Sequence, residues 1–529
     1  MSKFNSASAR PAVMSPVVTE RTPTGRTYEG APGYARDLKS ELFLLAVANT
    51  VGEATFYERA VYRDERYEQL IREAAIADPT WTASLLRWLR AEGNMRSAAL
   101  VGAAEAVKAR LEANAGGVEG INRKMIASVL QRADEPGELI AYWTSRYGRT
   151  IPKPVKRGIG DAVQRLYSGR SLLKYDTAGH GYRFGDVIDL VHPTPAADKP
   201  WQGDLFRYAL DRRHHREETG PVPPVVAANI ALRAEVAAGE YGGLLDAERL
   251  NAAGMTWEDA LSLAGSKVDK AQLWEAMIPS MGLFALARNL RNFDQAGVSD
   301  EAAASVAARF ADADEVATSR MFPFRWLAAY RHAPSLRWGH ALDRALTASL
   351  ANVPALPGRT LILVDVSGSM GTPSVGSLSD MTRMDAAAVF GAALALKTDP
   401  TLVAFSTSSN RVAVHAGGSL LRLVESIPRW GGGTNTAAAV QRWYAGHDRV
   451  VLVTDEQAHY AGFGDIAAAV PAHVPVYTWN LAGYRLGHAP SGVAVRHTFG
   501  GLSDAAFRLI PLIEAGRSGD WSTIFGADE

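Results

Sequence analysis

Three oxygen-bearing side chains follow a short apolar run in the second half of the chain. Residues Leu361–Val364 are all apolar and predict a buried strand, and Asp365, Ser367 and Ser369 come directly after it. In open parallel α/β sheets, ligands bind beyond the carboxyl ends of the strands. One carboxylate and two hydroxyls offer only oxygen, which suits a hard cation such as Mg²⁺ better than zinc or copper. The sequence therefore predicts a site for Mg²⁺ or another divalent cation at this strand end.

Two later stretches place further oxygen atoms at comparable positions. Thr434 follows three glycines and precedes a helical pattern, and Asp455 ends a second buried-strand run, Val450–Thr454. This order of side chains at the ends of successive βα units resembles the metal-ion-dependent adhesion site of von Willebrand factor A domains. The alternative is an α/β domain whose strand ends happen to be polar. The resemblance implies that five residues bind the ion, some of them through water: Asp365, Ser367, Ser369, Thr434 and Asp455.

Catalysis is the other chemistry that this set could perform. Asp365 on Mg²⁺ could be the nucleophile of a phosphoryl transfer, which would make the protein a Mg²⁺-dependent phosphohydrolase. That reaction requires a second aspartate nearby as the acid/base, and Ser367 occupies the position of this aspartate. The sequence has no motif of a P-loop protein, a zinc protease or a serine hydrolase. With two serines and a threonine as ligands, the ion keeps part of its charge and can accept a carboxylate from a partner. We therefore expect a binding protein and not an enzyme.

The composition limits the class of protein. The chain has 529 residues, enough for about two to four domains. Lys+Arg and Asp+Glu number 56 each, so any basic surface must be local. There is no cysteine, which excludes disulfides, thiol catalysis and cysteine-ligated zinc. An apolar run of about 18 residues is absent, and the N-terminus lacks the apolar core of a signal peptide. We therefore expect a cytoplasmic protein without a membrane partner.

The elements that must position these side chains change in character along the chain. Residues 1–34 are rich in Ser, Pro, Thr and Gly and predict a mobile N-terminal arm that could be ordered where it contacts the body. Residues 35–356 carry many short amphipathic patterns, which favour a stacked, all-α, HEAT-like helical repeat over one compact bundle. Residues 357–515 alternate helix and strand patterns, which predicts an α/β, Rossmann-like domain with a mainly parallel sheet. Residues 516–529 form a polar tail whose Trp521, Ile524 and Phe525 could anchor it to the helical part.

Local signatures in the helical half precede the predicted metal strand in a characteristic order. They lie at Trp274–Pro279, Ala285–Phe293, Pro323–Leu327 and Ser349–Arg359. With the A-domain pattern after them, they resemble the Ro autoantigen family, whose members carry a TROVE module followed by an A domain. The resemblance spans nearly the whole folded chain, and the missing cysteines suit a bacterial relative.

The resemblance implies a ring of helical repeats with a central hole, closed or bridged by the A domain. It further implies that small noncoding Y RNA binds the outer face of the ring, and that single-stranded 3′ ends of misfolded RNA enter the hole. In bacteria it implies work with polynucleotide phosphorylase or a similar 3′ exoribonuclease, in RNA quality control and degradation.

One stretch is basic in a chain without net charge. Residues 153–216 contain twelve Lys/Arg against seven Asp, and interleaved aromatic residues could stack on bases. Binding of phosphates by such cations would weaken steeply as salt increases. The alternative is a solvated helix face with aromatic residues in the core. The candidate RNA-binding residues in this stretch are Lys153, Lys156, Arg157, Lys174, His180, Arg183, His192 and Arg207.

The Y RNA contacts of Ro proteins are matched in part. Lys174 with Tyr175 matches the family's Lys-Tyr pair, and His192 stands before a proline as in the family. An arginine is expected four residues after the lysine, and here His180 is the nearest candidate. Arg288, in the second signature, is a further candidate that would face the hole. Its alternative is a structural arginine that pairs with a carboxylate between helices.

Three functions remain open: the Mg²⁺-dependent phosphohydrolase, which predicts phosphoester turnover that is lost on Asp365→Asn, and two binding functions that are compatible if the A domain recruits a protein to the RNA ring. The first binding function is an RNA-binding ribonucleoprotein scaffold, whose RNA affinity would depend on a 3′ tail and fall with salt. The second is an A-domain protein-interaction module without an RNA role, whose partner carboxylate would dock at the ion and be lost on Asp365→Ala.

Overall fold

The computed structural model describes most of the chain as two compact units. The described residues are 15–48, 51–217, 220–333, 335–351, 353–375, 380–459, 466–493, 495–503, 507, 509–514 and 520–525. The first unit, here the α/β unit, comprises residues 1–98, 320–328 and 342–529, and the second, the helical unit, comprises residues 99–319 and 329–341. Each unit is considered by itself below.

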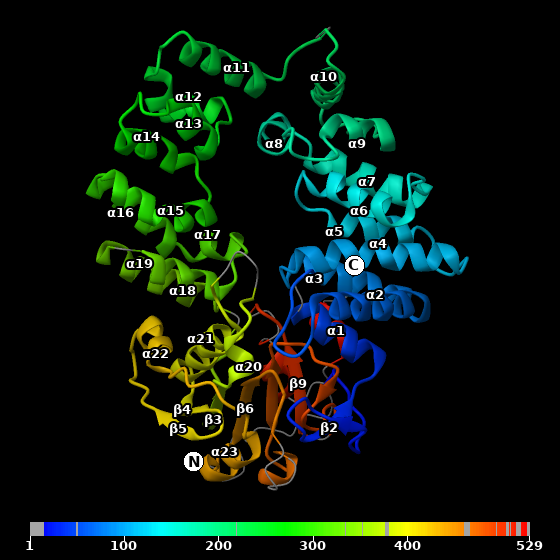
Figure 1. Ribbon diagram of the computed structural model, residues 1–529, viewed down its shortest axis with the longest axis vertical. Helices are drawn as coiled ribbons and strands as arrows, with labels where there is room; N and C mark the ends of the chain where they lie inside the picture. Colours follow the sequence, from blue (N-terminus) through cyan, green and yellow to red (C-terminus); the bar gives the residue numbers. More distant parts are fainter. Residues whose placement is uncertain are drawn as a thin grey trace, which may run out of the picture. The chain divides into compact units, whose positions relative to one another are not determined.

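A six-stranded sheet forms the centre of the α/β unit (Figure 1). The strand order is β5-β4-β3-β6-β7-β9, and every neighbouring pair is parallel except β4 with β5. This arrangement confirms the predicted Rossmann-like sheet. The strands are β3 (Arg359–Asp365), β4 (Asp399–Phe405), β5 (Ser409–Val412), β6 (Arg449–Thr454), β7 (Val476–Asn480) and β9 (Arg496–Gly500).

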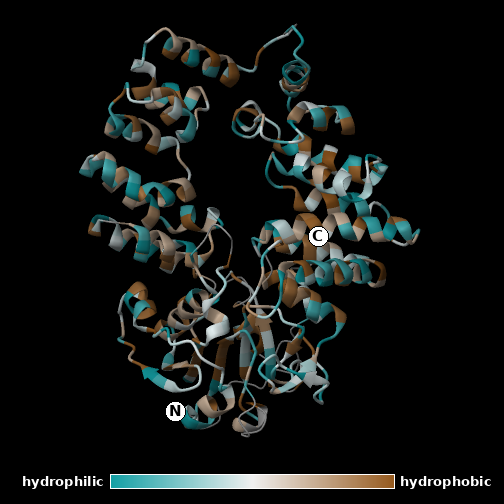
Figure 2. Cartoon of the chain, viewed as in Figure 1, coloured by the Kyte–Doolittle hydropathy of each residue, from teal (hydrophilic) through white to brown (hydrophobic). Residues whose placement is uncertain are grey.

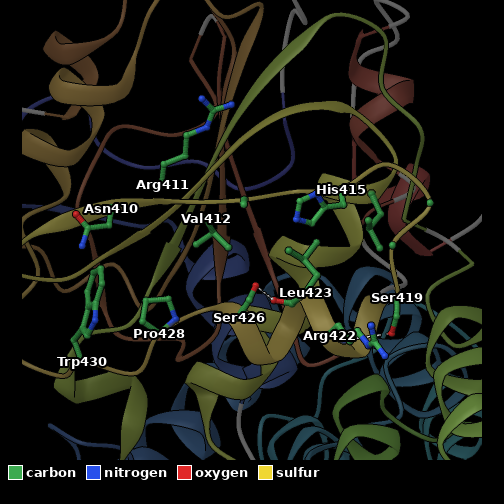
Figure 3. A pocket seen from close by; sticks show the side chains of 14 residues that line it. Asn410, Arg411, Val412, His415, Ser419, Arg422, Leu423, Ser426, Pro428 and Trp430 are labelled. Carbon is green, nitrogen blue, oxygen red and sulfur yellow. Dashed lines mark hydrogen bonds between the residues drawn. The ribbon is translucent and has the colours of Figure 1, made fainter.

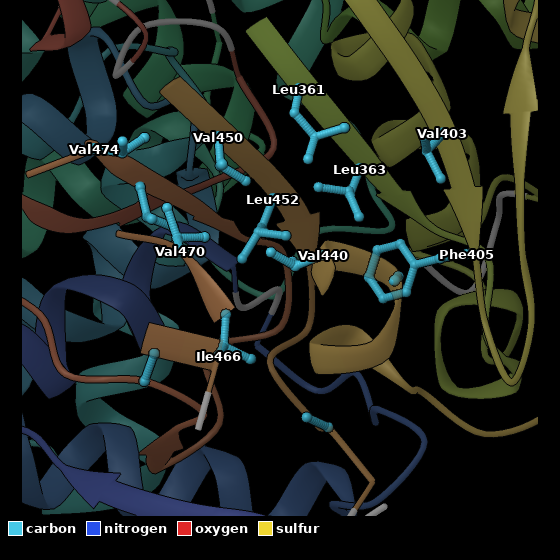
Figure 4. Close-up of a cluster of buried hydrophobic side chains, with 14 of the residues drawn as sticks. Leu361, Leu363, Val403, Phe405, Val440, Val450, Leu452, Ile466, Val470 and Val474 are labelled. Carbon is cyan, nitrogen blue, oxygen red and sulfur yellow. The ribbon is translucent and has the colours of Figure 1, made fainter. Parts of the chain in front are cut away.

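Alternate residues of β3 face two different layers of helices. Leu361 and Leu363 belong to a buried cluster that includes Val440 of helix α23 (Thr436–Trp443) (Figure 4). Val364 faces helix α21 (Arg383–Leu396), where a Cβ placed on Gly391 would lie 2.2 Å from the valine side chain. Because side chains of a strand alternate between faces, helices cover the sheet on both sides and the strands are apolar throughout. Short helices α20 (Gly368–Gly371), α22 (Leu420–Ser426) and α24 (Leu509–Glu514) complete this part.

The N-terminal segment is packed into the α/β unit. Strands β1 (Gly25–Arg26) and β2 (Pro32–Ala35) form a three-stranded antiparallel sheet with β8 (Leu486–Gly487). Arg36, directly after β2, forms a buried ion pair with Glu456. Within the arm predicted from composition, residues 15–34 are ordered where they contact the body, because strand pairing and this ion pair hold them. The remainder of that arm, residues 1–14, lies outside the described residues.

Three helices follow this segment, and an aromatic cluster joins the C-terminal tail to them. They are α1 (Leu38–Ala48), α2 (Ala60–Ala77) and α3 (Pro79–Ala91), and the tail helix is α25 (Trp521–Phe525). The Trp521 ring lies 5.2 Å from both Phe43 and Trp81, and Phe525 lies 5.9 Å from Trp81. Two of the three residues expected to anchor the tail therefore contact α1 and α3. Tail residues 516–519 and 526–529 lie outside the described part of the chain.

The helical unit is a succession of short helices that pack on one another in chain order. Contacts join α5 with α7, α7 with α9, α8 with α11, α11 with α12, α14 with α15 and α15 with α16. Apolar and hydrophilic residues alternate along these helices, as Figure 2 shows. This chain-order packing confirms the predicted helical repeat. Among the described residues, every helix is too short or insufficiently apolar to cross a membrane.

The helices of this array share lengths of about two to five turns. Their bounds are α4 (Arg96–Glu112), α5 (Ile121–Val129), α6 (Glu135–Tyr147), α7 (Lys153–Leu166), α8 (Gly169–Tyr175), α9 (Phe184–Val191), α10 (Gln202–His214), α11 (Pro224–Ala237), α12 (Ala247–Ala252), α13 (Trp257–Ala264), α14 (Lys270–Met277), α15 (Leu283–Ala296), α16 (Asp300–Ala311) and α17 (Ala313–Thr318). Two further helices, α18 (Pro323–His332) and α19 (Gly339–Ala348), have residues in both units.

Candidate metal and nucleic-acid sites

The end of β3 presents three buried oxygen-bearing side chains. Asp365 and Ser367 are fully buried, and Ser369 is 2% exposed. The Ser367 amide donates to Asp365 Oδ1 at 2.9 Å, and the Ser367 and Ser369 hydroxyl oxygens lie 3.3 Å apart. Thr454, at the end of neighbouring β6, donates from Oγ1 to Asp365 Oδ2 at 2.6 Å. These bonds fix the carboxylate and bring both serine hydroxyls beside it.

Thr434 and Asp455 contribute buried oxygen atoms that lack hydrogen-bond partners. Neither Thr434 Oγ1 nor Asp455 Oδ2 has a partner among the described residues, although both side chains are fully buried. The other carboxylate oxygen of Asp455, Oδ1, accepts the Gln457 amide at 3.0 Å. A buried polar atom without a partner costs roughly 1–3 kcal/mol, so such atoms call for a ligand. Two orphaned oxygens among the five predicted ligands fit a bound cation.

The glycine loop before Thr434 is tied to the β3 loop by main-chain bonds. Gly431 donates to the Val366 carbonyl at 2.9 Å, and Gly368 donates to the Gly432 carbonyl at 2.8 Å. Gly432 has a φ of 86°, and a Cβ at this position would lie 2.8 Å from the Thr407 hydroxyl. Only glycine therefore fits this turn, which brings the threonine loop to the Asp-Ser-Ser loop.

The electrostatics of the two aspartates also favour a cation. Burial and the charge of Asp455 raise the pKa of Asp365 above its ordinary value. Burial likewise raises the pKa of Asp455, and the nearby Glu29 carboxylate adds to this rise. Burial is the main cause of both rises in pKa, and the charge of Asp455 adds repulsion at Asp365 in this dry site. A divalent cation between them would offset that repulsion, and the hydroxyl and carboxylate oxygens are of the kind that Mg²⁺ prefers.

A further carboxylate that the sequence did not reveal reaches this site from the N-terminal segment. Glu29, between β1 and β2, accepts the Thr434 amide at its Oε2 at 3.0 Å. Its other oxygen, Oε1, accepts the Tyr57 hydroxyl at 2.7 Å. Glu29 and Thr434 lie 405 residues apart in the chain. No local sequence signal points to such a contact, which depends on how the segment packs.

The predicted RNA-binding residues fall into two groups in the structure. Arg183 pairs with buried Asp176 at 2.6 Å, and Arg207 pairs with Asp204 at 2.7 Å, so both guanidinium groups are engaged within the helical unit. The other predicted residues of the basic stretch make no ion pair among the described residues. They are Lys153, Lys156 and Arg157 on α7, Lys174 on α8, His180 in the loop after α8, and His192 directly after α9.

A cavity in the helical unit brings two predicted RNA-binding residues together. Lys174 and Arg288, 114 residues apart in sequence, line a cavity of about 370 Å³ with Arg170. Phe284, which is 47% exposed, and Trp257 supply aromatic surface to the same cavity. The Arg288 guanidinium lies 5.5 Å from the centre of the Phe284 ring. Arg288 makes no ion pair among the described residues. The alternative that it is a structural arginine paired with a carboxylate between helices is therefore not supported.

The cavity also contains neutral and acidic groups. Its lining side chains include three cations and one acidic residue, Glu258, so the net charge of the lining is positive. Its volume is in the range of small-ligand sites and would admit one nucleotide.

A second hollow lies at the edge of the α/β sheet, beside β5 and α22 (Figure 3). It measures about 740 Å³, and Arg411, His415 and Arg422 contribute polar groups to it. Pro428 and Trp430 supply apolar surface. None of the predicted metal ligands lines this hollow, so it is separate from the site at the end of β3.

Comparison with known proteins supports the resemblance expected from the sequence. Residues 249–337 match the family model of the TROVE domain. The structure is similar to the crystal structure of the Deinococcus radiodurans Ro (RSR) protein, with a TM-score of 0.59 and 17% sequence identity. The similarity covers 90% of this chain and 100% of that chain. No curated protein matches the chain. The expected resemblance to a bacterial Ro protein is therefore confirmed, by the TROVE match and by the fold.

Proposed function

We propose that this chain, which carries a TROVE domain and has the fold of a Ro protein, binds RNA through its helical unit. The observation that carries the proposal is the cavity where Arg170, Lys174 and Arg288 surround the exposed Phe284 ring. Cations that lack carboxylate partners can bind phosphates, and an exposed aromatic ring can stack on a base. A site of this kind recognises single-stranded RNA, because paired bases do not expose their faces.

The position of the cavity agrees with the family match. Trp257, Phe284 and Arg288 lie inside the matched segment, whereas Arg170 and Lys174 precede it. We propose that this cavity takes unpaired 3′ ends of misfolded RNA. The exposed cations of α7, Lys153 and Arg157, are proposed to bind a structured, Y-like RNA.

Binding of labelled RNA by the full chain tests the proposal. We expect a duplex with a single-stranded 3′ tail to bind more tightly than the same duplex with blunt ends. Lys174→Glu with Arg288→Glu should remove this preference, because like charges would then face the phosphates. Lys267→Glu is the matched control, since Lys267 is exposed and does not line the cavity. Equal binding of tailed and blunt RNA, or an equal loss in the control, would contradict the proposal.

We further propose that the α/β unit binds Mg²⁺ or another divalent cation through Asp365, Ser367, Ser369, Thr434 and Asp455. The orphaned buried atoms, Thr434 Oγ1 and Asp455 Oδ2, support this proposal. A bound ion would supply an electrophilic point that a carboxylate can ligate. The proposed role is attachment of a protein partner, such as a 3′ exoribonuclease, to the RNA-binding unit in the cytoplasm, with no catalysis by this chain.

Thermal and calorimetric titration with Mn²⁺ tests the cation site. Mn²⁺ at about 100 times its Kd should stabilise the chain by about 2.7 kcal/mol. Asp455→Asn should abolish this stabilisation, because it removes one ligand charge. At pH 8 without metal, the same variant should be at least as stable as the unaltered chain, since burial makes the charged aspartate costly. A Mn²⁺ effect that survives in Asp455→Asn would contradict the site.

A further inference from the structure

We infer that Glu29 is the chain's own carboxylate ligand for the divalent cation, so that the segment between β1 and β2 closes the metal site. The inference rests on the proposed cation site and adds a residue outside the set of five. Glu29 Oε2 accepts the amide of Thr434, the residue whose hydroxyl oxygen is orphaned and buried. The carboxylate therefore lies beside a predicted ligand and not at a distant part of the surface.

The hydrogen bonds to Glu29 leave lone pairs free for an ion. A carboxylate has about four lone-pair positions, and this one accepts a single bond at each oxygen. The Tyr57 hydroxyl donates to Oε1 at 2.7 Å, and the Thr434 amide donates to Oε2 at 3.0 Å. The side chain is half-buried, which limits competition from water. Glu29 can thus keep both bonds and still have an unused lone pair with which to bind the cation.

The loop that carries a metal ligand also holds Glu29 in place. The Tyr28 amide donates to Gln457 Oε1 at 2.9 Å, and the Thr27 hydroxyl donates to the Ala458 carbonyl at 2.7 Å. Gln457 itself donates its amide to Asp455. The turn that bears Glu29 is therefore bonded to the residues that directly follow Asp455.

Aromatic stacking fixes the other side of this turn. The Tyr28 ring stacks on Tyr57 with centroids 4.8 Å apart, and the Tyr57 ring meets Tyr484 edge-on at 5.7 Å. Tyr57 is also the donor to Glu29, so the stacked pair positions the hydroxyl that orients the carboxylate. Main-chain, side-chain and ring contacts together place one carboxylate at the site without any partner protein.

An internal carboxylate has a defined consequence for partner binding. The proposed ion can accept one carboxylate beyond its own hydroxyl and aspartate ligands, and Glu29 already takes that place. A partner's Asp or Glu must therefore displace Glu29 before it reaches the ion. The alternative is that Glu29 only caps the Thr434 amide and leaves the ion unaffected.

Calorimetric titration of the full chain with Mn²⁺ separates these two roles. Glu29→Gln keeps an oxygen that can accept a hydrogen bond but removes the charge, so its fold should be preserved. We expect Mn²⁺ affinity to fall by about tenfold or more, the range for lost metal-supporting groups. Glu20→Gln, in the same segment and exposed, is the matched control and should bind Mn²⁺ as the unaltered chain does.

A second variant adds chemical rescue. In Glu29→Ala, acetate should fit the vacated place and restore Mn²⁺ affinity, whereas acetate should not change the affinity of the unaltered chain. Equal Mn²⁺ affinity in Glu29→Gln and the unaltered chain would overturn the inference, as would a Glu29→Ala variant whose affinity acetate does not change. Absence of Mn²⁺ binding by the unaltered chain would instead contradict the proposed cation site itself.

Discussion

The Thr454 hydroxyl donates to Asp365 Oδ2 at 2.6 Å and thereby joins the ends of two neighbouring parallel strands. Both side chains are fully buried. The threonine also accepts the Glu456 amide at 3.0 Å, so a single hydroxyl links the strand end, the carboxylate and the loop after β6. This threonine lies outside the motif of five ligands, yet it sets the direction in which Asp365 points.

Thr454→Val should therefore weaken the cation site without removing a ligand. The variant has nearly the same shape but leaves the buried Asp365 oxygen without a donor, which costs about 1–3 kcal/mol. We expect a lower free energy of unfolding in urea and a Mn²⁺ affinity reduced by about tenfold. Thr478→Val, midway along β7, is the control. Unchanged Mn²⁺ affinity in Thr454→Val would show that the hydroxyl does not orient the carboxylate.

The stability of the α/β unit should depend on pH through His497. This residue is 1% exposed, and neither ring nitrogen has a hydrogen-bond partner among the described residues. Burial, followed by the charge of Arg496, lowers its pKa to about 4. The unfolded chain binds a proton at a pKa of about 6.5. The folded state therefore loses stability as pH falls through 6.5, by up to about 3 kcal/mol near pH 4.

Replacement of His497 tests how much of the loss of stability at low pH comes from this residue. His497→Phe keeps a ring that can stack on Tyr477, whose centroid lies 5.3 Å away, and cannot bind a proton. Urea unfolding at pH 7.5 and pH 5 should show a smaller loss of stability in the variant than in the unaltered chain. Identical losses in both proteins would mean that His497 is not the group that titrates.

Much of the metal site could be predicted from the sequence because its residues stand at strand ends. Asp365 and Asp455 directly follow or end apolar runs, and parallel strands bring such ends to one edge of a sheet. Glu29 could not be predicted, because the composition of its segment is typical of a mobile arm and its contact spans 405 residues. Strand pairing with β8 decides the structure there, and pairing partners are not encoded locally.

The RNA-binding candidates show a similar limit. Charge composition identified the basic stretch, but it could not show that Arg183 and Arg207 are engaged by aspartates of the same unit. Charge composition also could not predict that Lys174 and Arg288 line one cavity, because the packing of helices that are distant in the sequence brings them together. Family resemblance had marked Arg288, whereas its neighbour Phe284 became evident only from its exposure in the cavity.

Phe284→Leu should weaken binding of single-stranded RNA. Stacking of a base on an aromatic ring contributes about 1–3 kcal/mol, so we expect roughly a tenfold loss of affinity for an RNA with a 3′ tail. The fold should be little affected because the ring is 47% exposed. Phe56→Leu, an aromatic residue 50% exposed in the α/β unit, is the control. A loss of equal size for blunt duplex RNA would argue against stacking on an unpaired base.

The salt dependence of RNA binding tests the proposed RNA contacts most directly. Affinity for tailed RNA should be measured across a series of salt concentrations for the unaltered chain and for Lys174→Ala with Arg288→Ala. Each lost phosphate contact to a single strand lowers the slope of log affinity against log salt by about 0.7, so the double variant should lose about 1.4. An unchanged slope, or an affinity that does not respond to salt, would contradict RNA binding by this cavity.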